Sequence, residues 1–373
     1  MSTSMSKKHF GSFDVHSNNA VGVIIDEEKR WVFKRKFKND LPKILGALEN
    51  YRKTLSGIVV ESTFNWYWLV DGLTENGYKV HLAHTRATNT NSGKKYSDDY
   101  QDAFHLANLL RTGDLHEGYI YPKADRPLRD LLRKRGMLVK SRTQHLLSLI
   151  SLVNRHLGIQ VKSDHVKRWG MKEFEQLFSD ERLQLSGQSN LVVIKTLSAE
   201  IKKLEKSILE KGKLKKEFNV LRTIPGIGEV IALAISLEIG DINRFTKPGR
   251  YVSYCRCVPG ERRSNDKKKG EGNRKNGNKY LCWAYIEAAN FTKRHCPYAK
   301  AYYERKLKKT GKRVIALKAI AAKLARATYY MLKDGVKYDP ERLFNVPKLR
   351  KTNKGCGSKP DWGLAAKPAE PSV

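Results

Sequence analysis

The sequence has no apolar run near the roughly 18 residues that a membrane span needs, so no membrane partner is expected. Its first residues, MSTSMSKKHFGSFD, lack the apolar segment of a secretory signal peptide. It also contains no G-x-x-x-x-G-K-[ST] loop, which argues against a P-loop nucleotide as an energy source. These absences predict a cytoplasmic protein that works without a nucleoside triphosphate.

Cysteine is scarce and odd in number, the five being Cys255, Cys257, Cys282, Cys296 and Cys356. An odd count without an export signal favours reduced thiols over a disulfide framework. The first four, together with His295, could form a zinc-ligand set, although a second closely spaced pair is missing. We expect small buried apolar side chains, with zinc as the alternative.

Acidic residues are outnumbered almost two to one, 38 against 72 Lys and Arg, which gives a formal charge of +34. Residues 1–120 hold 16 basic and 14 acidic side chains, a net charge of +2, and residues 121–373 carry the other +32. Repulsion among so many like charges strains a compact fold, which is tolerable when the partner is a polyanion such as nucleic acid. We expect residues 121–335 to bind nucleic acid and the first 120 to have another task.

The near-neutral first part alternates short apolar runs with helical patterns. Strands are expected at 9–16, 20–26, 31–38, 57–61 and 78–83. Helices are expected at 41–53, 65–76 and 98–111. This order predicts a mixed α/β sheet domain, which we place at residues 1–122.

Helical patterns dominate the rest of the chain. Residues 127–157 are helical and strongly basic, and apolar residues from Ile194 to Ile208 repeat at heptad spacing over two heptads. This seam fits a helical hairpin and an intermolecular coiled coil about equally well. Later helices are expected at 279–294, 297–309 and 312–333. We divide this part into a basic helical or coiled-coil region at 123–215, a mainly α domain at 216–340 and a flexible tail at 341–373.

Residues 221–245 show a helix, a Pro-Gly-Ile-Gly turn and an apolar helix. This pattern is typical of a helix-hairpin-helix, whose turn presents backbone N–H groups to a phosphate. A plain corner between two helices is the alternative.

Four acidic residues stand out in the first domain. Asp14 ends the first predicted strand and Glu61 ends the fourth, while Asp99 and Asp102 share one face of a helix's first turn. Such carboxylates can converge at one rim of a sheet, where a hard cation would offset their repulsion. A pair of magnesium ions there could activate an attacking oxygen and stabilise a leaving one. Asp98 competes with Asp99, because it also faces Asp102.

The acidic blocks Phe-Asp14-Val, Val-Val-Glu61-Ser-Thr and Asp99-Tyr-Gln-Asp102-Ala are followed by three further blocks. These are Ile224-Pro-Gly-Ile-Gly228, Glu238-Ile-Gly-Asp-Ile-Asn-Arg-Phe245 and the stretch from Ser264 to Asn278. In this order the chain resembles the DEDD transposases of insertion sequences, relatives of the Piv DNA invertases, over roughly residues 9–335. The resemblance implies an N-terminal domain that is RNase H-like, similar to the junction resolvase RuvC, and a mainly α C-terminal transposase domain.

The family's catalytic serine falls on Ser264, which lies in a basic, glycine-rich loop. A serine hydroxyl is a weak nucleophile until a metal or a base activates it. By itself, a serine in such a loop is more often a turn former, and only the resemblance reverses that preference. Many relatives carry glycine after this serine; Asn265 stands there instead and tolerates the same left-handed backbone.

The resemblance implies a set of partners as well as a chemistry. Ser264 would attack a DNA phosphate, and the acidic cluster with Mg²⁺ would assist from a neighbouring protomer of a dimer or tetramer. A structured non-coding bridge RNA would select donor and target DNA, so that base pairing rather than protein reads the sequence. The setting would be the nucleoid of a bacterial cell.

Basic side chains in two segments are the predicted nucleic-acid contacts. They are Arg129, Arg133, Lys134, Arg135, Lys140, Arg142, Arg262, Arg263, Lys267, Lys268, Lys269, Arg274, Lys275 and Lys279.

Two other functions compete with transposition. A junction resolvase or nuclease on the same acidic domain would hydrolyse DNA with water and would not need Ser264. In a non-catalytic nucleic-acid scaffold, these four acidic residues would be replaceable without loss of function.

Overall fold

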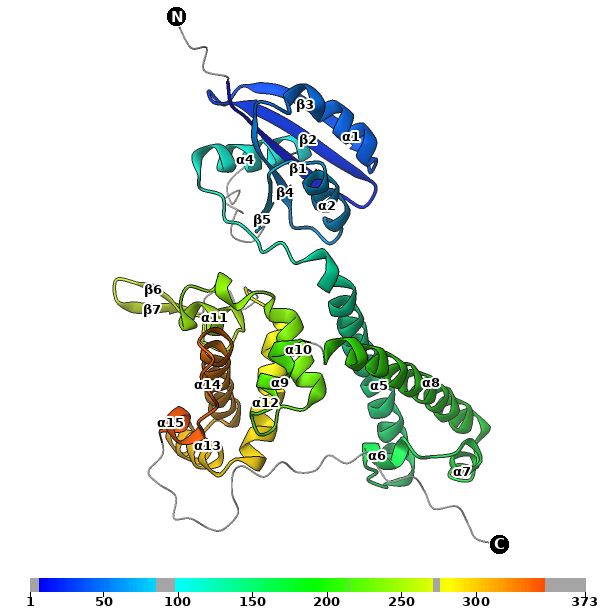
Figure 1. The fold of residues 1–373 in the computed structure, drawn as a ribbon. Helices are drawn as coiled ribbons and strands as arrows, with labels where there is room; N and C mark the ends of the chain where they lie inside the picture. Colours follow the sequence, from blue (N-terminus) through cyan, green and yellow to red (C-terminus); the bar gives the residue numbers. More distant parts are fainter. Residues whose placement is uncertain (1–6, 85–97, 214, 271–275, 346–373) are drawn as a thin grey trace, which may run out of the picture. The chain divides into compact units, whose positions relative to one another are not determined.

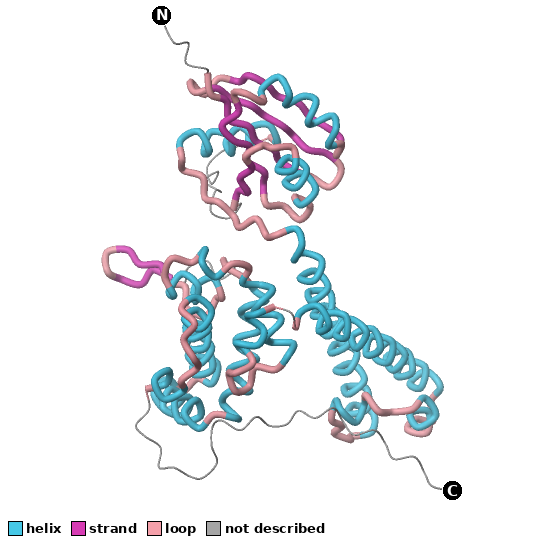
Figure 2. Tube along the Cα trace, in the orientation of Figure 1, coloured by secondary structure: helices cyan, strands magenta, loops and turns pink. Residues whose placement is uncertain are grey.

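The computed structural model describes residues 7–84, 98–213, 215–270 and 276–345 (Figure 1). The chain divides into two compact units, with the boundary between Lys123 and Ala124. The first is a mixed five-stranded sheet with helices, and the second is mostly helical (Figure 2). Among the described residues, no helix is long and apolar enough to cross a membrane.

The sheet of the first unit has the order β3-β2-β1-β4-β5. Its strands are β1 His9–Val15, β2 Asn19–Asp26, β3 Trp31–Lys38, β4 Leu55–Glu61 and β5 Val80–Ala83. The first three strands form an antiparallel meander, whereas β4 pairs in parallel with both β1 and β5. Because β1 and β4 are parallel, their C-terminal ends lie at the same rim of the sheet.

Helices cover both faces of this sheet. They are α1 Leu41–Leu48, which continues into a 3₁₀ turn at Glu49–Tyr51, α2 Tyr67–Glu75 and α4 Asp99–Thr112. Alternate side chains of β2 lie on opposite faces of the sheet. Ala20 and Ile24 pack with α1 and α2, whereas Val21 and Val23 pack against Ala103 of α4. The period-2 side-chain alternation of a strand therefore positions α4 across the sheet from the other two helices.

The second unit begins with a long helical hairpin. Its elements, after a 3₁₀ turn at Lys123–Asp125, are α5 Arg126–Leu157, α6 Ser163–Val166, α7 Met171–Glu175 and α8 Glu181–Gly212. Helices α5 and α8 lie side by side (Figure 1). The heptad residues Ile194, Ile201 and Ile208 are buried within the unit. Of the two interpretations of the seam, the structure therefore has the hairpin within one chain.

The remaining elements form the largest apolar core. They are α9 Lys216–Leu221, α10 Glu229–Ile239, a 3₁₀ turn at Ile242–Arg244, α11 Pro248–Tyr254, β6 Arg262–Ser264, β7 Lys267–Gly270, α12 Lys279–His295, α13 Pro297–Thr310, α14 Arg313–Lys333 and α15 Pro340–Phe344. Helix α10 is central to this core, since every residue from Ile231 to Ile239 is buried.

The Pro-Gly-Ile-Gly turn joins α9 and α10 and packs tightly. Gly226 has φ +92°, and a Cβ there would lie 2.4 Å from the backbone nitrogen of Thr292 in α12. The close approach to α12 explains this glycine without a ligand. Phosphate binding by the turn stays a prediction.

Candidate functional site

The first part of the candidate site is built where β1 and β4 end. Asp14 lies at the end of β1 and is only 5% exposed. The parallel register pairs Phe13 with Val60, which brings Asp14 beside Glu61 at the end of β4. The strand ends thus place two of the four predicted acids at one rim of the sheet.

His16 joins these acids to α4. Its Nε2 lies 3.3 Å from Asp14 Oδ2 and 3.5 Å from Asp99 Oδ2, and the three side chains offer ligand atoms within 4.8 Å of one another. Lys36 Nζ lies 3.8 Å from Asp99 Oδ2. His16 was not among the residues predicted from the sequence. The signal was its position two residues after Asp14, because side chains two apart along an extended chain point to the same side.

Asp98 and Asp99 have different tasks. The side chain of Asp98 accepts a 2.8 Å hydrogen bond from the backbone N–H of Gln101 and is the N-cap of α4. The side chain of Asp99 faces His16 instead. The capping role uses the Asp98 carboxylate locally, so Asp99 is the better placed candidate ligand.

Glu61 shows how closely the carboxyl groups approach one another. Burial raises its pKa, and so do a hydrogen bond with Asp14 and the negative charges of Asp14 and Asp102, to about 8. Like charges held together in a partly dry site disfavour ionisation in this way. Asp14 and Asp99 thus lie together around His16, and Glu61 interacts with Asp14 through a hydrogen bond and with Asp102 through its charge.

These residues fit a divalent cation. Carboxylate oxygens are the donors that hard cations such as Mg²⁺ and Mn²⁺ prefer, and a histidine nitrogen extends the choice toward transition metals. A cation there would relieve the repulsion that raises the pKa of Glu61. The donor set supports a divalent cation in general rather than one element.

We expect Mg²⁺ or Mn²⁺ to raise the thermal midpoint of unfolding of the full chain. A ligand that binds only the folded state stabilises it by about 2.7 kcal/mol at a hundredfold excess over its Kd. Asp14→Asn should remove most of this shift in differential scanning fluorimetry. The control Asp114→Asn loses the same charge at an exposed position of the same unit and should keep the shift. An equal shift in Asp14→Asn and wild type would contradict the site.

The second part of the candidate site is the β6–β7 hairpin. Ser264 is exposed at the end of β6 and pairs with Lys267 of β7. The two residues between them, Asn265 and Asp266, have φ angles of +50° and +55°. This is the left-handed backbone expected at Asn265, and two such residues suit the tight turn of a β-hairpin. The predicted loop is therefore partly a hairpin, with the serine next to its tip.

The predicted nucleic-acid contacts fall into different environments. Exposed side chains are those of Lys134, Lys140, Lys267, Lys269 and Lys279. Arg262, Arg263 and Lys268 lie in the strands of the hairpin, whereas Arg274 and Lys275 lie outside the described residues. Arg142 donates a 3.2 Å hydrogen bond to Ser198 Oγ of α8.

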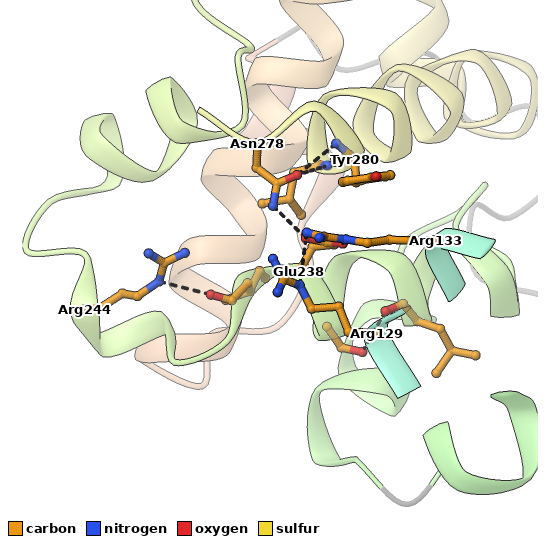
Figure 3. Close-up of polar contacts among 10 residues, drawn as sticks. Arg129, Arg133, Glu238, Arg244, Asn278 and Tyr280 are labelled. Atoms are coloured by element: carbon orange, nitrogen blue, oxygen red, sulfur yellow. Dashed lines mark hydrogen bonds and ion pairs between the residues drawn. The ribbon is translucent and has the colours of Figure 1, made fainter. Parts of the chain in front are cut away.

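In the structure, Arg129, Arg133 and Arg135 have acidic partners within their own unit, and their contact with nucleic acid stays a prediction. Arg135 donates to Glu205 Oε1 of α8, with Nε at 2.8 Å. Arg133 forms two hydrogen bonds with the carboxylate of Glu238, and Arg129 forms a third at 3.3 Å (Figure 3). These guanidinium groups neutralise acids within the unit, so a phosphate would have to compete for them.

The described cysteines are free thiols. Burial, with the charges of neighbouring thiols, raises the pKa of Cys255 and brings that of Cys257 to about 12, which keeps both protonated. Zinc binds the thiolate form. Among the described residues, the Asp14–His16–Asp99 group is the one found with metal-ligand geometry, and it contains no cysteine. Cys255, Cys257 and Cys296 are buried, as the buried-thiol interpretation expects, and Cys356 lies outside the described residues.

Carboxylate clusters that hold divalent cations occur in enzymes that cut or join nucleic acids, such as polymerases and nucleases. Comparison with known protein families shows which enzymes this chain is similar to. Residues 12–157 match a family model described as "Transposase", that of the DEDD domain of IS110 elements, and residues 218–304 match "Transposase IS116/IS110/IS902 family". The chain thus contains two segments that match transposase domains of IS110-type insertion sequences, which confirms the resemblance to the DEDD transposases drawn from its motifs.

Two curated relatives are also named as transposases. A "Putative transposase y4qE" of Sinorhizobium fredii is 27% identical over 209 residues, which cover 55% of this chain and 50% of the relative. The "Transposase for insertion sequence element IS1111A" of Coxiella burnetii is 26% identical over 239 residues, which cover 61% and 60%. The chain thus spans about half to three fifths of the length of these relatives.

Proposed function

We propose that the chain is a DNA transposase that cuts and rejoins DNA to move an insertion sequence. The observation that carries the proposal is the set of carboxylates around Asp14, within residues that match a family model of transposases. The mixed sheet order, with an antiparallel meander followed by two parallel strands, is compatible with an RNase H-like domain similar to RuvC.

The Ser264 hydroxyl is the proposed nucleophile. Its Oγ would attack a DNA phosphorus, the bond from phosphorus to the leaving sugar oxygen would break, and that oxygen would depart as a hydroxyl after receiving a proton. The new phosphoserine bond keeps the energy of the phosphodiester, so a sugar hydroxyl can later displace the serine and rejoin DNA. The exposed Lys267 opposite Ser264 is placed to attract the phosphate.

The acidic cluster is proposed to act on the same reaction. A divalent cation held by Asp14, Glu61, Asp99 and Asp102, with Mg²⁺ as the first choice, would stabilise charge on the phosphate oxygens. His16 is near enough to Asp14 and Asp99 to orient both carboxylates or to provide a further ligand. In a dimer or tetramer, the cluster of one protomer would serve the serine of another.

Nucleic-acid selection is proposed to depend on a bridge RNA. The family resemblance implies a structured non-coding RNA that pairs with donor and target DNA. The net charge of +32 beyond residue 120 supports binding to a polyanion without base-specific contacts. The most direct test is to search the DNA beside the gene for such an RNA and to co-purify it with the protein.

The distribution of charge leads to a prediction about binding. Affinity of the full chain for RNA and DNA should fall steeply with salt, because each phosphate that is neutralised releases condensed counterions. A fragment of residues 1–120, with a net charge of only +2, should bind weakly at every salt concentration. Filter binding between 50 and 200 mM salt, about the range over which such complexes lose most affinity, measures both. Tight, salt-sensitive binding by the fragment would overturn the assignment of the basic region.

A hydrolytic junction resolvase remains the second candidate function, because the same carboxylates could activate water. It differs from the transposase in leaving a free DNA end and no protein–DNA bond.

A further inference from the structure

A buried carboxylate lies between the long helical hairpin and the segment that carries Ser264. Glu238 is the penultimate residue of α10, and its side chain is 1% exposed. Arg133 donates to its two oxygens at 2.6 and 2.8 Å, and Asn278 Nδ2 donates to Oε2 at 2.7 Å. Arg129, one turn before Arg133 in α5, donates to Oε2 at 3.3 Å (Figure 3).

The stability of the fold alone does not explain this arrangement. Burial raises the pKa of Glu238, but the hydrogen bonds and charges of its partners outweigh burial and hold the pKa below its ordinary value. The negative end of the α10 dipole also opposes a carboxylate near the C-terminus of that helix. Buried ion pairs of this kind rarely stabilise a fold more than apolar side chains of the same volume would, and their best-attested benefit is a single defined geometry.

The hydrogen bonds of Glu238 fix the C-terminal end of the segment that carries Ser264, which runs from Arg256 to Asn278. Asn278 Oδ1 caps α12 by accepting hydrogen bonds from the backbone N–H groups of Tyr280 and Leu281, at 2.8 and 3.1 Å. Its own backbone N–H donates to the carbonyl oxygen of Tyr254 at 2.6 Å. The guanidinium of Arg133 also packs on the ring of Tyr280, 4.4 Å from its centroid. Asn278 therefore joins Glu238, α11 and the start of α12.

The two ends of the segment also meet. Arg256 Nη2 donates to the carbonyl oxygen of Gly277 at 2.8 Å, and its Nε lies 3.1 Å from the carbonyl oxygen of Asn276. Gly277 has φ +88°, and a Cβ there would lie 2.4 Å from the Tyr254 carbonyl oxygen. Arg256 and residues 276–278 thus lie against each other, and the β6–β7 hairpin with Ser264 lies between them in the chain (Figure 1). Residues 271–275 of this segment lie outside the described residues.

We propose that Glu238 and Asn278 are positioning residues for Ser264: Arg129 and Arg133 of α5 hold Glu238, and Glu238 holds Asn278 at the base of the serine segment. The role in catalysis rests on the proposed function, whereas the effect on the segment does not. The exposed Lys134 and Lys140 share α5 with these arginines, so nucleic acid bound along α5 would contact the same helix that anchors the serine segment.

Two changes at Asn278 separate capping from anchoring. Asn278→Ser and Asn278→Asp both keep an oxygen that can cap α12. The serine side chain is one bond shorter than that of asparagine, so the hydroxyl that caps α12 falls short of Glu238, and an aspartate carboxylate has no N–H to donate. In Asn278→Asp two carboxylates also face each other. The double variant Glu238→Gln/Asn278→Asp restores the hydrogen bond with donor and acceptor exchanged, and it keeps the total charge of the group. Glu205→Gln is the matched control, because it breaks another acid–arginine pair of α5, that with Arg135.

The readouts are the rate of tryptic cleavage after Lys267 or Lys269, and the rate of formation of a covalent protein–DNA product at saturating DNA. Losing a hydrogen bond to a charged group should change local opening by roughly tenfold or more. Both single variants should therefore be cleaved about tenfold faster and react about tenfold more slowly. The double variant should recover most of both rates. Glu205→Gln should lower the thermal midpoint of unfolding and leave both rates near those of the wild type.

Wild-type rates in a folded Asn278→Ser protein, or a folded double variant no better than Asn278→Asp, would overturn the positioning role. If the wild type forms no covalent product, the serine chemistry of the proposed function is wrong, and tryptic cleavage alone decides the proposal. Faster cleavage in Asn278→Asp with recovery in the double variant would then support anchoring of the segment, and unchanged cleavage would reject it.

Discussion

Ser264→Ala should abolish recombination and the covalent protein–DNA product while leaving DNA affinity unchanged. The side chain is exposed next to the tip of the β6–β7 hairpin, so its loss removes one oxygen and disturbs no core. Removing the nucleophile leaves the metal cluster and the basic side chains intact, yet no protein oxygen remains to conserve the phosphodiester's energy. We expect a rate loss of at least about a thousandfold, equivalent to roughly 4 kcal/mol in the activation free energy.

A gapped DNA substrate, which traps the broken strand, followed by a denaturing gel would show the product directly. Ser189→Ala is the matched control, since Ser189 is also exposed but lies on α8, where its hydroxyl bonds the carbonyl oxygen of Leu185. No product from the wild type, or an undiminished one from Ser264→Ala, would favour the hydrolytic resolvase instead.

The strands of the first unit could be predicted because local pattern and tertiary environment agree there. The predicted strand at 31–38 has the bounds of β3, and that at 20–26 differs from β2 by one residue. The helix expected at 41–53 is shorter in the structure, where α1 ends at Leu48 and a 3₁₀ turn follows. Apolar periodicity locates a helix more reliably than it locates the end of one.

The acidic site was predictable in part for the same reason. Strand ends and a helix start are visible in the sequence, and parallel pairing of β1 with β4 brings Asp14 and Glu61 to one rim. The choice between Asp98 and Asp99 depends on which carboxylate turns back to cap α4, a detail of backbone geometry that spacing does not contain. His16 required knowledge that the chain stays extended just beyond β1.

The partners of Arg129 and Arg133 could not be predicted from the sequence. Helical spacing places the two side chains on one face of α5, four residues apart, but does not say what that face meets. Glu238 lies 105 residues beyond Arg133, and its pairing depends on how α10 packs against α5. A basic helix that faces an acid of its own unit has the same sequence pattern as a basic helix that faces a phosphate.

Glu61→Ala should abolish recombination while nucleic-acid binding persists, because the basic region beyond residue 120 is untouched. A cation at a phosphoryl-transfer site contributes several kcal/mol of transition-state stabilisation, so loss of a ligand should cost about a thousandfold or more. Strand exchange by the full chain in Mg²⁺, with binding measured in parallel, tests both statements. Glu49→Ala, which removes an exposed acid of the same unit that pairs with Arg52, should recombine normally.

A measurement of stability distinguishes loss of the cation site in Glu61→Ala from simple loss of folding. Without a divalent cation, Glu61 has a folded pKa near 8 against an ordinary value of 4.5, so the folded state holds the proton more tightly. An acid whose pKa is raised on folding costs stability as the pH rises from about 4.5 to 8. Glu61→Ala should therefore remove that pH dependence and leave the cation-free protein at least as stable as the wild type at pH 8, as measured by thermal unfolding.

A variant that recombines at the wild-type rate would disprove the metal assignment. One that is inactive and also unfolds early would show that Glu61 supports the sheet rather than a cation, because relief of repulsion with Asp14 and Asp102 predicts the opposite change in stability.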